Sequence, residues 1–82
     1  MNSLLTLAAS QNVTLTRATT VQILNCLAYM QRRQGYEKGS ARYLECEDAA
    51  MKILKKLGEL RFLIWDLQYE TEIDWVSELS NI

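Results

Sequence analysis

Apolar residues recur at alternating steps of three and four positions through the middle of this chain. They are Tyr43, Cys46, Ala50, Ile53, Leu57, Leu60, Ile64 and Leu67. A repeat that averages about 3.5 residues places all of its members on one stripe of a helix that faces a partner helix. The pattern predicts a single helix from Ala41 to about Glu70, roughly 45 Å long at 1.5 Å per residue.

A second, shorter helix is predicted to begin after Thr16 and to run to Gln34, where Gly35 stops it. Arg32 and Arg33 would lie in its last turn, where cations interact favourably with the helix dipole. Its inward stripe would consist of Ile23, Leu27 and Met30.

A short loop, Gly35-Tyr36-Glu37-Lys38-Gly39-Ser40, joins the two helices. Ser40 can cap the helix that follows. Because so short a connection favours antiparallel neighbours, the two helices should form a hairpin. Folding the hairpin about its loop sets Leu27 beside Asp48 or Ala49. Within the longer helix, Asp48 can form an ion pair with Lys52, one turn further along.

Two short terminal helices complete the predicted elements. The first would run from Ser3, a possible N-cap, to about Ser10. The last would run from Glu72 to Ser80, after a capping box formed by Thr71-Glu72-Ile73-Asp74. It would bury Ile73, Val76 and Leu79, with Trp75 alongside.

The composition supports an all-α fold, because the 82 residues contain no proline and only three glycines. This length suits one domain, residues 1–82. The predicted fold is an antiparallel helical hairpin with one long heptad-patterned helix and short terminal helices, a small bundle that dimerisation could complete.

Part of the heptad stripe has no partner within the predicted hairpin. The shorter helix begins opposite Gly58, so the stripe beyond that point lies uncovered. The uncovered residues are Leu60, Leu63, Ile64 and Leu67. Burying four such side chains is worth on the order of 6–12 kcal/mol. Either the terminal segments fold back over them, or a second copy of the chain covers them.

A second apolar row follows the outward side of the long helix. It comprises Leu44, Met51, Gly58 and Trp65 at seven-residue spacing, together with Phe62 and Tyr69. Two interpretations remain open: the terminal segments pack on these side chains, or the side chains form a recognition surface, since aromatic residues are enriched at interface centres. The candidate partner-binding residues are Leu44, Met51, Phe62, Trp65 and Tyr69.

Basic residues gather around the hairpin loop and offer an alternative site. They are Arg32, Arg33, Lys38 and Arg42, with Tyr36 among them. Cations on one surface can contact phosphates, and an aromatic ring can stack on a base. The other interpretation is a solvated turn after a helix end.

The chain offers little for catalysis. It has no histidine, the commonest general base and neutral metal ligand, and no glycine-rich phosphate loop. Cys26 and Cys46 are the only candidate nucleophiles and are expected to be buried structural thiols. We therefore expect no enzyme activity, cofactor, metal site or small-molecule substrate.

Several features bear on the cellular setting. We identify no secretory signal and no apolar stretch near the roughly 20 residues that span a bilayer. The net charge is −1, which does not favour unspecific binding to nucleic acid. With its cysteines reduced, the chain is expected to be cytoplasmic.

The sequence thus predicts a non-enzymatic protein–protein interaction module. It would act as a homodimer, or by docking an apolar helical face onto another protein. Its size and simplicity suggest a small accessory or inhibitory factor of viral or mobile-element origin. The alternative is a small nucleic-acid-binding regulator that uses the basic loop.

Overall fold

The computed structural model describes residues 4, 8–69 and 73–80. All regular secondary structure in these residues is helical, which confirms the all-α fold class. The elements are α2 (Arg17–Arg33), α3 (Ala41–Leu57), the 3-10 turn η1 (Gly58–Leu60), α4 (Arg61–Leu67) and α5 (Trp75–Ser80). Leu4 and residues 8–10 are also helical, and the proposed cap Ser3 lies outside the described residues.

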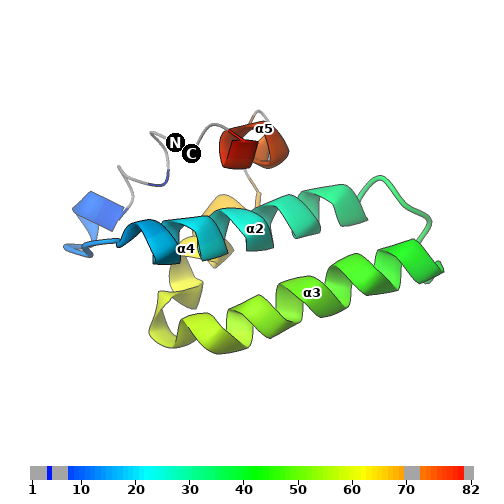
Figure 1. Cartoon of the computed structure of the whole chain (residues 1–82), viewed down its shortest axis with the longest axis horizontal. Helices are drawn as coiled ribbons and strands as arrows, with labels where there is room; N and C mark the ends of the chain where they lie inside the picture. The colour runs from blue at the N-terminus through cyan, green and yellow to red at the C-terminus, as the bar shows by residue number, and fades with distance from the viewer. Residues whose placement is uncertain (1–3, 5–7, 70–72, 81–82) are drawn as a thin grey trace.

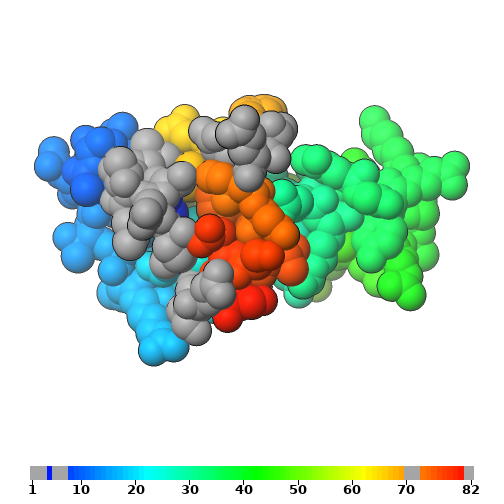
Figure 2. All heavy atoms as spheres, turned by 90° about the horizontal axis from the view of Figure 1, so that it is seen from above, coloured from blue at the N-terminus to red at the C-terminus, as the bar shows by residue number. Residues whose placement is uncertain are grey.

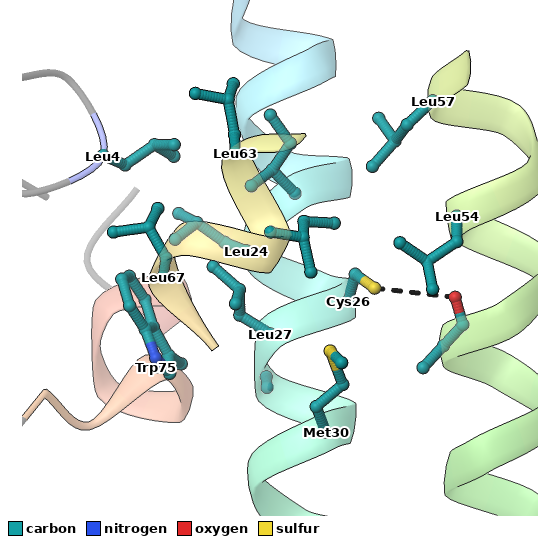
Figure 3. Packing of buried hydrophobic residues seen from close by; sticks show 14 residues of the cluster. Leu4, Leu24, Cys26, Leu27, Met30, Leu54, Leu57, Leu63, Leu67 and Trp75 are labelled. Carbon is teal, nitrogen blue, oxygen red and sulfur yellow. Dashed lines mark hydrogen bonds between the residues drawn. The ribbon is translucent and has the colours of Figure 1, made fainter. Parts of the chain in front are cut away.

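Helix α2 is the centre of the molecule. Helix α3 lies along one side of it, and α4 and α5 lie on the other (Figure 1; Figure 3). It begins, as predicted, after Thr16, whose hydroxyl oxygen accepts a hydrogen bond from the backbone N–H of Thr19 at 3.1 Å. Its buried residues are Thr20, Ile23, Leu24, Cys26, Leu27, Ala28 and Met30. Because α2 has neighbours on two sides, its buried face is wider than the predicted stripe of three residues.

Helix α3 runs back beside α2 in the opposite direction (Figure 1). Ser40 caps it as predicted, accepting the backbone N–H of Tyr43 at 3.2 Å. The predicted ion pair between Lys52 and Asp48 is present at 3.1 Å. The thiol of Cys26 donates to the carbonyl oxygen of Ala50 at 3.5 Å, within one residue of the register obtained by folding the hairpin about its loop.

The long helix predicted from Ala41 to Glu70 is wrong. Helix α3 ends at Leu57, and Gly58 adopts φ 57° and ψ −121°. Side chains are strained at positive φ, whereas glycine has no Cβ and takes up this conformation readily. The chain turns at this residue, and η1 leads it into α4 as a separate helix.

The turn at Gly58 brings the second half of the heptad stripe back onto α2. Leu63 and Ile64 are fully buried and Leu67 is 4% exposed. In Figure 3, Leu67 lies between Leu4 and Trp75, which come from the two terminal segments. Three of the four residues that the sequence left uncovered are therefore buried within the chain, and the fourth, Leu60, is half-buried against the same cluster. Burial of these side chains favours the turn over a straight helix that would leave them in water.

The last helix also differs from its prediction. It begins at Trp75, after Asp74, whose carboxylate accepts the backbone N–H groups of Val76 and Ser77 at 3.1 and 3.2 Å. Trp75 is its one buried residue, whereas Ile73, Val76 and Leu79 are only half-buried. The remainder of the predicted capping box, residues 71 and 72, lies outside the described residues.

The side chain of Gln31 in α2 connects this helix to the start of α5 through two hydrogen bonds. Its side-chain amide donates to the carbonyl oxygen of Ile73 at 2.8 Å, and its amide oxygen accepts the backbone N–H of Trp75 at 2.8 Å. The two bonds satisfy polar groups that would otherwise be left unpaired beside the core. They also fix the point at which Trp75 enters the space beside α2.

Candidate interaction surface

The outward face of α4 is aromatic. Phe62 and Trp65 lie at i and i+3 on α4, opposite the face that buries Leu63, Ile64 and Leu67. Tyr69 lies in the turn just after the helix. Trp65 is 54% exposed and Tyr69 is 78% exposed. Phe62 is half-buried and packs against the core, so it supports this face more than it extends it. Trp65 and Tyr69 together are hereafter called the aromatic face.

Leu44 and Met51 are exposed on a different helix. They lie one above the other on α3 and are 51% and 50% exposed. The sequence placed them on one continuous row with Gly58 and Trp65, and this is wrong because the chain turns at Gly58. The five predicted partner-binding residues thus divide into a pair on α3 and an aromatic group on α4 and the turn that follows it. Gly58 was the only signal of this division in the sequence.

The molecule exposes the aromatic face and the hairpin loop in different regions. In Figure 2, atoms of α4 lie along one edge, beside the α5 segment, while the loop lies at one end of the molecule. Figure 1 also places the loop at the end of α2 remote from the start of α4. The two candidate sites are therefore separate surfaces.

Interactions within the chain already engage part of the basic group. The guanidinium of Arg33 lies 5.6 Å from the ring centre of Tyr43 and 3.9 Å from the carboxylate of Glu47. The guanidinium of Arg32 lies 5.8 Å from the ring centre of Tyr29. These contacts orient both arginines along the hairpin. The other members, Tyr36, Lys38 and Arg42, are exposed at or beside the loop.

The two cysteines occupy different environments. Cys26 is buried, and burial raises the pKa of its thiol from 9.0 to about 11, although the positive charge of Arg33 acts in the opposite direction. A thiol with this pKa stays protonated at neutral pH and is a poor nucleophile. Cys46 is half-buried, so the prediction of a buried thiol is wrong at this position. Neither cysteine forms a disulfide.

We expect Cys26 to react slowly with iodoacetamide. A pKa raised from 9.0 to about 11 lowers the thiolate fraction about 100-fold at neutral pH. The reaction of Cys46→Ser, which retains only Cys26, should therefore be about 100-fold slower than that of an unfolded control, as followed by mass spectrometry. Equal rates in the folded and unfolded chains would contradict the burial of this thiol.

The same shift gives a direction to the dependence of stability on pH. Because the folded-state pKa of Cys26 is raised, its contribution is fully present below about pH 9 and is lost as the pH rises through about 11. The decrease in the free energy of unfolding as the pH rises from about 9 to about 11 should therefore be smaller in Cys26→Ala than in wild type.

Acidic residues do not gather into a metal site in the part of the chain that the structure describes. No three histidine, cysteine, aspartate or glutamate side chains come together there. Asp74 has a local role instead, because hydrogen bonds from the Ser77 hydroxyl and from the backbone lower the pKa of its carboxyl. Among the described residues, no helix has the length and apolar character needed to cross a bilayer.

Comparisons with protein-family models, curated proteins and solved structures give no match to this chain. The function is therefore inferred from the surfaces and interior of the chain itself.

Proposed function

We propose that this chain is a non-enzymatic protein–protein interaction module that docks its aromatic face onto a partner protein. The observation that carries the proposal is the exposure of Trp65 and Tyr69, 54% and 78%. Trp65 lies on α4, whose opposite side is buried, and Tyr69 lies in the turn just after this helix. Tryptophan and tyrosine dominate the binding energy of many interfaces. A small accessory or inhibitory factor would act through such a contact.

The size of the aromatic face favours a partner with a groove. Aromatic side chains bury about 150–250 Å² each, so the exposed parts of these two offer about 200–330 Å². A stable dimer of standard size needs about 800 Å² from each partner. The aromatic face alone is thus too small for a flat homodimer interface, and it suits anchors that insert into an apolar groove. Exposed Asp66 and Arg61 would supply the polar rim.

The pair on α3 could extend the contact. Leu44 and Met51 add apolar surface beside Lys52 and Asp48, whose ion pair keeps the centre of this helix polar. Without other large exposed apolar residues beside them among the described residues of α3, they are the weaker anchor.

Nucleic-acid binding through the basic loop is the alternative. Arg32, Arg33, Tyr36, Lys38 and Arg42 would contribute to it. Arg33 would have to leave Glu47 and Tyr43 to contact a phosphate, which reduces the gain from binding. This makes the aromatic face the preferred candidate.

A photo-crosslinking side chain at position 69 tests the proposal. Placed there in the cells that make the protein, it should give one protein adduct, which mass spectrometry identifies. The purified partner should then bind Trp65→Ala about 30-fold more weakly than wild type, a loss of about 2 kcal/mol.

Arg32→Ala combined with Arg33→Ala is the matched control and should leave this affinity unchanged. If the double arginine variant instead abolishes a salt-dependent shift of RNA or DNA, while Trp65→Ala has no effect on any complex, the alternative function holds.

A further inference from the structure

The three residues of η1, Gly58–Leu60, separate two helices that share one heptad repeat. The repeat continues from Tyr43 to Leu67 without a gap, although the helix is broken at Gly58. The residues on both sides keep helical backbone angles: φ −74°, ψ −23° at Leu57 and φ −55°, ψ −26° at Arg61. A change of φ and ψ centred on Gly58 would therefore join α3, η1 and α4 into one helix whose apolar stripe is continuous.

Packing does not require a glycine at this bend. A Cβ atom added to Gly58 would meet nothing within 4 Å, so the residue is not squeezed against another part of the protein. What glycine supplies is the backbone conformation, φ 57° and ψ −121°. The bend is held by Arg61, whose backbone N–H and side-chain Nε both donate to the carbonyl oxygen of Gly58, the latter at 2.9 Å. These are local, exposed contacts, and such contacts are individually weak.

We propose that Gly58 is a hinge through which two copies of this chain exchange α4 and α5. In the straight form, α4 leaves its own α2 and extends beyond it. Leu63, Ile64 and Leu67 then pack on α2 of the second copy, at the surface that α4 covers within a single chain. A second copy is the partner that fits this surface in every detail, because the surface is already complementary to α4.

The exchange also transfers α5 and its hydrogen bonds with Gln31 to the second copy. Trp75 would enter the core of the second copy, and its backbone N–H would reach Gln31 there, as it does within the single chain. The buried contacts of Leu63, Ile64, Leu67 and Trp75 are thus made in both forms. The balance between them depends on the hinge conformation, the new helical hydrogen bonds and the entropy of association, so it shifts with protein concentration.

Gly58→Ala tests the hinge directly. Alanine disfavours the positive φ of the bend and favours the continuous helix, and the two effects act in both chains of a dimer. We expect this variant to be dimeric by light scattering, with a dissociation constant lower than that of wild type by about 10³-fold or more. A helical, monomeric Gly58→Ala overturns the proposal.

Gly39→Ala is the matched control. Gly39 also has positive φ, 88°, and open space around its Cβ position. It lies in the loop, where no apolar repeat continues across it. This variant carries a comparable backbone penalty and should keep the mass of wild type. Dimerisation of both variants would show that strain alone, and not the continuous repeat, drives association.

Wild type provides a second test that does not depend on how the variants fold. Refolded from denaturant at about 1 mM, it should contain a dimer that returns to monomer after dilution. A single-chain mass throughout overturns the proposal.

Gly58→Ala combined with Trp65→Ala separates this inference from the docking function, on which it does not rest. The dimer should persist in the double variant, because Trp65 lies outside the exchanged contacts. Loss of the dimer would assign association to the aromatic face and contradict the exchange.

Discussion

Replacing Trp75 by alanine is expected to lower the free energy of unfolding by about 3–5 kcal/mol, the usual cost of truncating a large buried aromatic side chain. Trp75 is 2% exposed and belongs to the cluster that joins α2, α4 and α5. A chain of this size has a total stability of about 4–12 kcal/mol at 0.05–0.15 kcal/mol per residue. The variant should therefore lose a large part of its total free energy of unfolding, as measured by urea denaturation followed by circular dichroism.

Two other substitutions serve as controls for this loss. Trp65→Ala removes the same side chain from the surface, where it is 54% exposed, and should change stability by no more than about 0.5 kcal/mol. Trp75→Phe keeps most of the buried volume and removes an indole N–H that has no hydrogen-bond partner among the described residues, so it should cost less than about 1.5 kcal/mol. Equal losses for the two tryptophan-to-alanine variants would show that α5 does not pack on α2 as described.

The second large effect is expected at Ile64, where alanine should lower the free energy of unfolding by about 2–5 kcal/mol. Ile64 is fully buried, on the side of α4 that faces the core. Met51→Ala is the control, because Met51 is 50% exposed and its loss should change stability by no more than about 0.5 kcal/mol.

The concentration dependence of unfolding of the wild-type chain tests the packing of Ile64 in a second way. If the contacts that bury Ile64 are made within one chain, the urea midpoint of wild type is independent of protein concentration in the micromolar range. If these contacts are made between chains, the midpoint rises with concentration by mass action. The structure places these contacts within the chain, and we expect a constant midpoint at these concentrations.

Together these variants separate folding from recognition on one short helix. Ile64 and Trp65 are neighbours in sequence, but one side chain is fully buried and the other is 54% exposed. The first should affect stability and the second should affect partner binding. A partner-binding defect in Trp65→Ala at unchanged stability would support the proposed docking function.

Much of the local structure follows from the sequence. The N-cap Ser40 and the start of α2 after Thr16 were predicted correctly, because capping depends on a side-chain oxygen and an N–H three residues away. The all-α class and the boundaries of α2 also rest on local features: the absence of proline, and Gly35 just beyond the helix. The exposed aromatic residues could be identified by their spacing, although not by their degree of exposure.

The tertiary structure alone decided what happens at Gly58. A 3.5-residue repeat describes which side chains are apolar, and it fits equally well a straight helix and two helices that turn back on a common neighbour. The turn is favoured because it lets Leu63 and Ile64 become buried against α2. The free energy gained by this burial depends on residues some 40 positions earlier in the chain. The same long-range packing buries Trp75 and leaves Trp65 exposed. The sequence determined which segments are helical and which residues are apolar; the packing of distant segments on α2 determined which apolar residues form the core and which remain at the surface.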